Sequence, residues 1–253
     1  MTTTHVAGRY AGKAAVITGA GSGIGQATAL RLAAEGAHVL GLDINAEGLA
    51  TTAARADAGI ETRQCDIADP AQCRAAIEDA VERFGRLDVL GNVAGIARAD
   101  HLQDVTEAAY RQMMGVNVDG YFFMAQAAIP HLLHEGGAIV NIASNAGIIG
   151  QAYTVVYCMT KGAVIQLTRA LAMEYLKTPL RVVAIAPGMV DTGLTRGYQM
   201  PADVDWDLVG RYISPRGATP PETIAALFAF LASGDAPNMH GAIVSADHGM
   251  TTG

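Results

Sequence analysis

The chain has 253 residues, of which 51% are hydrophobic and 16% charged, and its formal net charge is −7. This composition supports a large buried core and excludes a disordered chain. An acidic chain without a basic run is a poor partner for nucleic acid or for an anionic membrane surface. Its apolar runs stop well short of the ~18 residues of a membrane span, and its first ten residues lack the apolar core of a signal peptide.

Short apolar runs alternate with longer helical patterns along the whole chain. Strands are predicted over 14–18, 38–42, 61–65, 88–91, 138–142, 180–185 and 242–245, and helices over 23–35, 46–57, 70–84, 106–134, 155–176 and 221–232. Strands separated by helices of this length form βαβ units and a parallel sheet that is covered on both faces. The sequence therefore predicts one doubly wound α/β domain over residues 1–253.

Residues 193–219 are the least regular part of the chain and contain Trp206, Tyr198 and Tyr212. Irregular segments of this length are often functional lids. The segment could be a lid that closes over a small or medium apolar substrate, or it could be an ordered surface excursion. The sequence does not favour either of these two alternatives.

The cysteines and histidines give no sign of a disulfide framework or a metal centre. Cys65, Cys73 and Cys158 form no Cys-x-x-Cys motif, and we expect buried thiols in a reducing compartment, which favours a cytoplasmic protein. His131 and His134 end a predicted helix without a third ligand nearby, so no metal site is expected.

A glycine-rich turn, Thr18-Gly19-Ala20-Gly21-Ser22-Gly23-Ile24-Gly25, joins the first strand to the first helix. Glycines let the backbone approach a pyrophosphate, whose charge the helix N-terminus favours. The spacing fits T-G-x-x-x-G-x-G rather than G-x-G-x-x-G or the triphosphate loop. In this position it predicts a dinucleotide site that uses Gly19, Ser22, Gly23, Ile24 and Gly25.

Two acidic residues follow the next two strands. Asp43 ends the second strand, where a carboxylate can bind the two hydroxyls of an adenosine ribose and repel a 2′-phosphate. NAD is therefore predicted over NADP, although Asp43 would also suit a cap for the helix that begins at Ala46. Asp66, followed by Ile67, is expected to meet the adenine edge or to cap a helix together with Asp69.

Tyr157 and Lys161 are four residues apart on a predicted helix, so their side chains share one face. A fixed positive charge favours the phenolate and is expected to lower the tyrosine pKa from its ordinary value near ~10. The pair is a candidate proton donor and acceptor. On its own, the same pattern also fits a solvated helix face or a packed tyrosine.

Six motifs occur together in a fixed order: Thr18-Gly-x-x-x-Gly-Ile-Gly25, Asn92-x-Ala94-Gly95, Asn117, Ser144, Tyr157-x-x-x-Lys161 and Pro187-Gly188-x-Val190-x-Thr192. Over residues 12–250 they resemble the short-chain dehydrogenase/reductase family. The resemblance implies a Rossmann-like, doubly wound seven-stranded parallel sheet and a nicotinamide cofactor, with Asn92, Ala94 and Gly95 bordering it.

The resemblance also implies a catalytic tetrad of Asn117, Ser144, Tyr157 and Lys161. Tyr157 would be the general acid/base, and Lys161 would lower its pKa and hold the nicotinamide ribose. Ser144 would polarise the substrate oxygen, and Asn117 would hold a water that links Lys161 to solvent. Taken singly, Ser144 could be a loop cap and Asn117 a core hydrogen bond.

The same resemblance places Pro187, Gly188, Val190 and Thr192 around the nicotinamide, although Thr192 also suits a helix N-cap. The chain departs from the family pattern at two places. Val93 stands where a second Asn is frequent, and Ala246-Asp247-His248-Gly249 replaces the usual Val-Asp-Gly-Gly. The role of His248 stays open.

The sequence thus predicts an NAD-dependent oxidoreductase that interconverts a secondary alcohol and a ketone. The rival within the same class is an NADPH-dependent 3-oxoacyl-thioester reductase, and the alternative of another class is a non-catalytic cofactor-binding regulatory or scaffold protein. The predicted helices over 106–134 and 155–176 are apolar on more than one face. The resemblance implies that they pair between subunits of a symmetric homotetramer.

Overall fold

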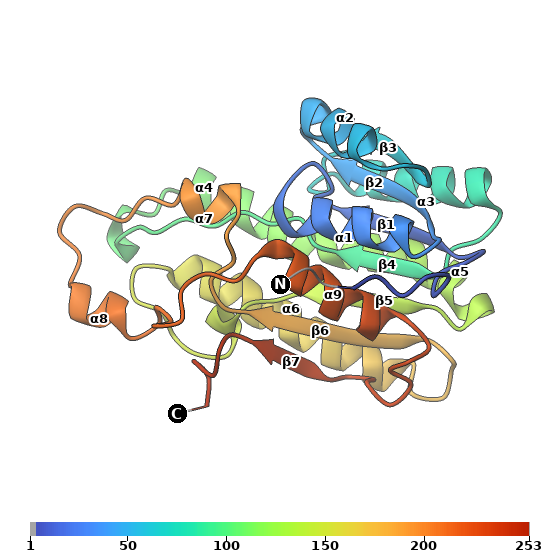
Figure 1. The fold of residues 1–253 in the computed structure, drawn as a ribbon. Helices are drawn as coiled ribbons and strands as arrows, with labels where there is room; N and C mark the ends of the chain where they lie inside the picture. The colour runs from blue at the N-terminus through green and yellow to red at the C-terminus, as the bar shows by residue number, and fades with distance from the viewer. Residues whose placement is uncertain (1–3, 253) are drawn as a thin grey trace.

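The apolar run Ala14–Thr18 forms β1, a fully buried strand near the centre of a parallel sheet in the computed structural model, which describes residues 4–252 (Figure 1). The sheet has seven strands in the order β3-β2-β1-β4-β5-β6-β7. All of the pairings are parallel. The predicted doubly wound seven-stranded fold is confirmed.

The elements alternate as the hydrophobic pattern predicts. The strands are β1 (Ala14–Thr18), β2 (His38–Asp43), β3 (Ile60–Gln64), β4 (Val89–Asn92), β5 (Ala138–Ile142), β6 (Arg181–Pro187) and β7 (Ile243–Ala246). The main helices are α1 (Gly23–Ala34), α2 (Ala46–Arg55), α3 (Pro70–Phe84), α4 (Glu107–Met114), α5 (Gly120–Glu135), α6 (Val155–Glu174) and α9 (Pro221–Ala232). Short helices α7 (Gly193–Arg196) and α8 (Trp206–Gly210) and the 3-10 turns η1 (Leu102–Asp104) and η3 (Asn145–Gly147) lie in the connections.

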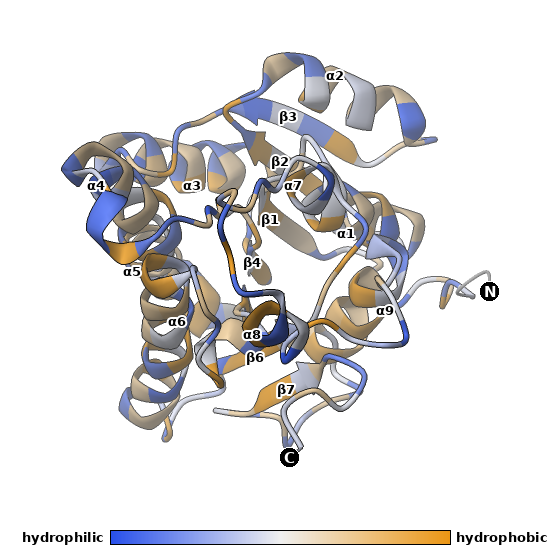
Figure 2. Ribbon diagram, turned by 90° about the vertical axis from the view of Figure 1, so that its left-hand side faces the viewer, coloured by the Kyte–Doolittle hydropathy of each residue, from blue (hydrophilic) through white to orange (hydrophobic). Residues whose placement is uncertain are grey.

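The sheet separates two apolar layers because successive side chains of a strand point to opposite faces. In β1, Ile17 packs in the layer that includes Phe228 of α9, while Val16 packs in the layer that includes Met124 of α5. Figure 2 shows α1 and α9 on one side of the sheet and α3, α5 and α6 on the other. Both faces of the sheet are therefore covered, as a parallel sheet requires.

The predicted helix over 106–134 is interrupted. A π turn, η2 (Gly115–Asp119), separates α4 from α5. Hydrophobic periodicity does not reveal a one-residue widening of a helix, and π turns occur mainly at functional sites. The other predicted boundaries agree with the observed ones or differ by one or two residues. For example, α2 ends at Arg55 because the next residue is extended, and β4 begins after Asp88, whose carboxylate accepts the Ala14 N–H at 2.9 Å.

The strand order reverses between β1 and β4, and this divergence opens a crevice at the carboxyl ends of the strands. The Thr18 hydroxyl, at the end of β1, accepts the backbone N–H groups of Val93 (2.8 Å) and Ala94 (3.1 Å) just after β4. Ligands of open α/β sheets bind at this kind of reversal. The fold therefore indicates where a functional site should lie.

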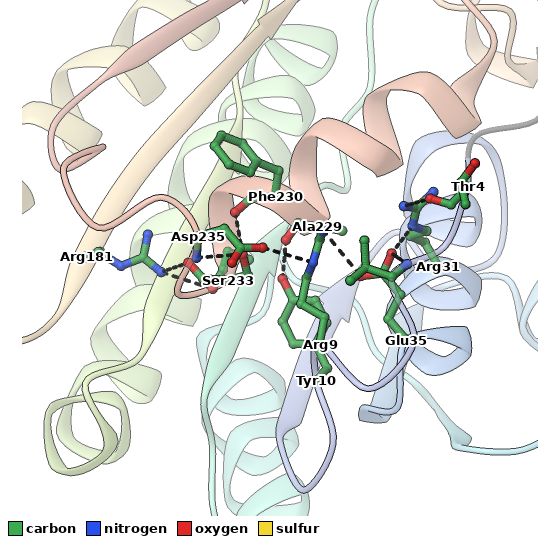
Figure 3. Close-up of polar contacts among 12 residues, drawn as sticks. Thr4, Arg9, Tyr10, Arg31, Glu35, Arg181, Ala229, Phe230, Ser233 and Asp235 are labelled. Carbon is green, nitrogen blue, oxygen red and sulfur yellow. Dashed lines mark hydrogen bonds and ion pairs between the residues drawn. The ribbon is translucent and has the colours of Figure 1, made fainter.

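A buried ionic cluster joins the N-terminal arm to the ends of α1 and α9, at the opposite end of α1 from the crevice (Figure 3). Glu35 is fully buried and is contacted by Arg31 at 2.5 Å and Arg9 at 3.5 Å. Arg9 also reaches Asp235 at 3.3 Å. Arg181 of β6 donates to four carbonyls at the end of α9: Leu231, Ala232, Ser233 and Ala236. These contacts satisfy helix-end carbonyls that would otherwise lack partners.

The three cysteines are unpaired, with Cys65 and Cys73 buried and Cys158 half-buried. Within residues 4–252 there is no group of three or more His, Cys, Asp or Glu side chains that could hold a metal ion. No helix in the same range is long and apolar enough to cross a membrane.

Candidate active site

The glycine turn packs so tightly that two of its glycines cannot carry a side chain. A Cβ on Gly25 would lie 2.1 Å from the Gly19 carbonyl oxygen. Gly19 has a left-handed backbone (φ +71°), and a Cβ there would lie 2.9 Å from the Ala94 Cα. Ser22 precedes α1 in an extended conformation without a side-chain cap. The first turn of α1 therefore presents backbone N–H groups to the crevice, as an anion site requires.

A groove of about 340 Å³ runs over the ends of β1, β2 and β4 beside this turn. Eleven of the predicted cofactor residues line it: Gly19, Ser22, Gly23, Ile24, Gly25, Asp43, Asp66, Ile67, Ala94, Gly95 and Thr192. Backbone donors, closely packed glycines and a carboxylate at the far end of the groove fit a dinucleotide.

Asp43 does not cap the following helix. Asn45 does so, because its side-chain oxygen accepts the N–H groups of Glu47 and Gly48, both at 3.1 Å. Asp43 instead accepts the Gly21 N–H at 2.9 Å and the Asn45 N–H at 2.9 Å. Its carboxylate thus ties the end of β2 to the glycine turn, and the helix-cap alternative for Asp43 is wrong.

Asp66 is likewise not the cap of α3. Asp69 takes that role by accepting the Ala71 N–H at 2.8 Å. Asp66 accepts the Ala68 N–H at 2.9 Å and borders the groove.

Asn92 is the predicted cofactor residue whose side chain does not reach the groove. Its amide is fully buried and donates to the Asn141 side chain at 3.0 Å and to the Tyr121 carbonyl at 3.4 Å. Asn141 in turn donates to Thr168 of α6 at 2.9 Å. The Asn92 side chain therefore joins β4, β5 and α6 inside the sheet layer, which leaves its backbone as the part that could border a cofactor.

A second pocket, of about 100 Å³, contains the predicted catalytic groups Ser144, Tyr157 and Lys161. The predicted nicotinamide residues Pro187, Gly188, Val190 and Thr192 also line it. It is continuous with the groove, since both are lined by Ile24, Val93, Gly95, Thr192 and Leu194. Residues from five separated motifs thus meet in one place.

Ser144 and Tyr157 face each other across this pocket. Ser144 precedes η3, and its hydroxyl accepts the Ala146 N–H at 3.1 Å, so its role as a loop cap is real. A hydrogen bond from the Ser144 side chain to Tyr157 lowers the pKa of the phenol, but burial raises this pKa more strongly, to above its ordinary value. The sequence-based expectation of a lowered tyrosine pKa is therefore wrong for this geometry.

The Lys161 ammonium is hydrogen-bonded to groups other than the Tyr157 phenol. It donates to the Ile142 carbonyl at 2.8 Å and to the Tyr121 hydroxyl at 3.5 Å, and lies 5.9 Å from the centre of the Tyr157 ring. The side chain is 3% exposed. Burial lowers the pKa of Lys161 to about 7, because a low-dielectric interior disfavours an unpaired charge.

Asn117 lies in the π turn η2 and is fully buried. Its side-chain oxygen accepts the Ile96 N–H at 2.9 Å, and its amide nitrogen donates to the Ile96 carbonyl at 2.8 Å and to Thr160 at 3.1 Å. These are the contacts of a core hydrogen bond, the plain alternative for this residue. They hold the backbone after Gly95 against α6, next to Lys161.

Two further residues of the site were missed by sequence reasoning. Tyr121 of α5 is fully buried and donates to the Ile142 carbonyl at 3.1 Å, beside Lys161. Thr160 accepts from Asn117 and donates to the Tyr157 carbonyl at 2.9 Å. Thr160 could have been suspected from its place between Tyr157 and Lys161, but a tyrosine in an apolar helix carries no such signal.

The irregular segment 193–219 begins at the pocket. Thr192 caps α7 in a reciprocal arrangement with Thr195, and it also packs against the glycine turn, where a Cβ on Gly23 would lie 3.0 Å from its methyl group. Leu194 and Thr195 line the pocket that contains Ser144, Tyr157 and Lys161. At the far end of the segment, Thr219 lies 3.3 Å from Nε2 of His248.

A larger surface groove, of about 990 Å³, runs along the outer side of α1 toward α9. It touches the glycine turn at Ser22 and Gly23 but contains none of the four predicted catalytic side chains. The candidate acid/base groups line the smaller pocket instead.

Comparison with known proteins bears directly on this site. Residues 19–251 match the family model described as Enoyl-(Acyl carrier protein) reductase. The chain is 37% identical to the meso-2,3-butanediol dehydrogenase of Serratia marcescens, with 96% of each chain covered. It belongs to the short-chain dehydrogenase/reductase family.

Other family members agree over the same length. The cis-4-hydroxycyclohexanecarboxylate dehydrogenase of Sinomonas cyclohexanicum is 41% identical, with 96% of this chain and 98% of the relative covered. A crystal structure of the 3-ketoacyl-(acyl-carrier-protein) reductase of Brucella melitensis complexed with NADH has a TM-score of 0.87 and 33% identity, covering 96% of this chain and 99% of that one. This short-chain dehydrogenase/reductase is an NAD(P)-dependent oxidoreductase that acts on CH–OH groups. An enzyme is therefore favoured over the non-catalytic alternative.

Removal of the buried ammonium should change how stability depends on pH. Lys161 has a pKa of about 7 when folded and 10.5 in its ordinary state, so the unfolded chain binds more protons between these values. The free energy of unfolding of the wild type therefore gains a contribution as pH rises from 7 to 10. Relative to wild type, Lys161→Met should be more stable at pH 7, by as much as a few kcal/mol, and this advantage should fade toward pH 10.

Urea unfolding of both proteins at several pH values measures this difference. Lys177→Met, at an exposed position, is the matched control and should show no such trend. A difference between Lys161→Met and wild type that stays constant with pH would contradict the lowered pKa.

Proposed function

We propose that the protein is an NAD-dependent dehydrogenase that interconverts a secondary alcohol and a ketone, with Tyr157 as general acid/base. The observation that carries this proposal is the single pocket that holds the Tyr157 phenol, the Ser144 hydroxyl and the Lys161 ammonium and continues into the glycine-turn groove. A substrate oxygen beside Tyr157 and Ser144 could exchange a proton with the phenol and accept a hydrogen bond from the serine.

In this proposal the cofactor supplies the hydride chemistry, and the chain supplies binding and proton transfer. Tyr157, with its raised pKa, is a neutral phenol near pH 7 and is suited to protonate the oxygen of a ketone as it is reduced. When an alcohol is oxidised, Tyr157 must instead receive the alcohol proton. Lys161 has a pKa of about 7, so it can gain or lose a proton and thereby change the charge near the Tyr157 phenol. Asn117 acts indirectly by holding the backbone at Ile96.

The preference for NAD rests on Asp43. Its carboxylate lies at the end of β2 and accepts the N–H of Gly21 in the glycine turn. An adenosine ribose is expected at this place. The ribose hydroxyls can donate to the carboxylate, whereas a 2′-phosphate would meet a like charge. The NADPH-dependent 3-oxoacyl-thioester reductase is the rival proposal, and it predicts tighter binding of NADPH than of NADH.

We also propose a symmetric homotetramer formed through α5 and α6, which lie side by side in Figure 2. Large apolar side chains stand exposed on both helices: Phe122 is 46% exposed, Met159 51% and Met173 72%. Exposed apolar surface of this kind is characteristic of protein interfaces. The unpaired cysteines further suit a reducing compartment such as the cytoplasm.

Substitution of the proposed acid/base should remove turnover without removing cofactor binding. Tyr157→Phe deletes the one hydroxyl that can exchange the proton, so kcat should fall at least about 100-fold. NADH affinity, measured by fluorescence titration, should change little. Wild-type turnover by Tyr157→Phe on an identified alcohol would refute the proposed function.

The cofactor assignment predicts tighter binding of NADH than of NADPH. In Asp43→Asn the like charge is lost, so the preference for NADH should shrink at least about tenfold. Titration of both nucleotides against wild type and variant measures this. Asp57→Asn, at an exposed position outside the groove, is the control and should keep the wild-type preference. Tighter NADPH binding by the wild type would favour the thioester reductase.

The oligomer can be checked by light scattering coupled to size exclusion. The wild type should have four times the mass of one chain. Phe122→Asp places a charge in the proposed interface and should yield smaller species, whereas Arg74→Glu on the exposed side of α3 should leave the tetramer intact. A monomeric wild type would rule out the proposed assembly.

A further inference from the structure

The irregular segment 193–219 leaves the catalytic pocket, extends away from the sheet as far as α8, and returns at Thr219 (Figure 1). Its middle part rests on the short turn that precedes α6. The backbone N–H of Asp205 donates to the Tyr153 hydroxyl at 2.8 Å, and the Tyr212 hydroxyl donates to the Ala152 carbonyl at 3.0 Å. We call residues 193–219 the substrate loop and residues 151–154 the supporting turn.

Tyr153 has an unusual backbone. Its φ is +66°, and among residues 4–252 the only other non-glycine residue in the left-handed region is His248 at +59°. A bulky side chain disfavours this conformation, which persists only where surrounding contacts impose it, commonly at functional sites. Both of these residues contact the substrate loop, Tyr153 at Asp205 and His248 at Thr219.

The contacts that hold Tyr153 come from a third segment. Its carbonyl accepts the Asp100 N–H at 2.8 Å, and its ring meets the His101 ring edge-on at 5.2 Å between centres. His101 also pairs with Asp203 of the substrate loop at 2.8 Å, but the Asp203 side chain is 81% exposed. Such an exposed contact contributes little, so the Tyr153 hydroxyl is the firmer attachment.

The supporting turn leads directly into the catalytic helix. Thr154 precedes α6, and Tyr157 lies in its first turn. Tyr198 of the substrate loop is half-buried. Burial raises the pKa of Tyr198, and the neighbouring Tyr212 and Tyr157 phenols raise it further, which is consistent with Tyr198 lying between the loop and the catalytic tyrosine.

We propose that Tyr153 is a positioning residue, which fixes the substrate loop to the start of α6 so that the loop closes the substrate side of the pocket around Tyr157. The inference rests on the proposed function, because it assigns the loop to substrate binding. Its left-handed backbone points the Tyr153 side chain toward Asp205 while the chain continues into α6. Tyr153 itself does not touch the reacting atoms.

Tyr153→Phe removes only the acceptor of the Asp205 N–H and keeps the ring beside His101. Loss of one such hydrogen bond should raise the population of the detached loop about three- to tenfold. Trypsin should therefore cleave after Arg211 and Arg216, both exposed residues of the loop, faster by a similar factor. This assay needs neither cofactor nor substrate.

The kinetic consequence should appear in substrate binding. The KM for the alcohol should rise about three- to tenfold, while the KM for NAD and the midpoint of thermal unfolding should stay at their wild-type values. Tyr175→Phe makes the same chemical change at the other end of α6, where no hydrogen bond of the hydroxyl occurs among the described residues, and is the matched control. It should leave cleavage and KM unchanged.

Three outcomes would overturn the proposal: loop cleavage at the wild-type rate, faster cleavage with an unchanged KM for the alcohol, or a lowered thermal midpoint with faster cleavage throughout the chain. The first shows that Tyr153 does not hold the loop, the second that the loop does not position substrate, and the third that Tyr153 serves only folding. The proposed function is tested separately by Tyr157→Phe, so failure of one is distinguishable from failure of the other.

Discussion

The candidate catalytic pocket depends on one buried charge that lacks a countercharge. Lys161 is 3% exposed, and its ammonium is held by a strand-end carbonyl and a tyrosine hydroxyl. Among the described residues it forms no ion pair with a carboxylate. A buried ion in this position is expensive, and the fold tolerates it because the pKa falls to about 7. The group is thereby kept near its titration point, where a proton can be gained or lost at little cost.

The surroundings of Lys161 are built by elements that are distant in sequence. The Ile142 carbonyl, at the end of β5, accepts the hydrogen bond of the Lys161 ammonium. Tyr121 reaches it from α5, and Asn117, four residues earlier in the π turn, holds the Ile96 backbone on the other side. The irregular helix therefore supplies two polar groups that frame the ammonium. A regular α-helix over the same residues would give the side chains of Asn117 and Tyr121 different relative positions.

Sequence reasoning predicted the parts of the site that depend on local pattern. Glycine spacing located the turn, and the interval between Tyr157 and Lys161 placed both side chains in one pocket, because a helix fixes that geometry. Sequence reasoning did not predict the features of the site that depend on burial or on contacts between residues far apart in the chain. The pKa of Tyr157 is raised because burial outweighs the Ser144 hydrogen bond. Asn92 faces into the sheet because Asn141, a residue of another strand, offers its amide a partner.

The fold could be predicted because it, too, depends on local sequence pattern. The substrate could not be predicted from such a pattern. Alternation of apolar runs and helical patterns determines a parallel sheet and its crevice, and these are shared with relatives whose names indicate quite different substrates. Residues 193–219 have no periodicity, and they are placed by contacts to the turn before α6 and to His101. Because these contacts are non-local, the hydrophobic pattern of the sequence does not predict them. If residues 193–219 bind the substrate, as proposed above, substrate choice depends on the part of the chain where the sequence pattern is least informative.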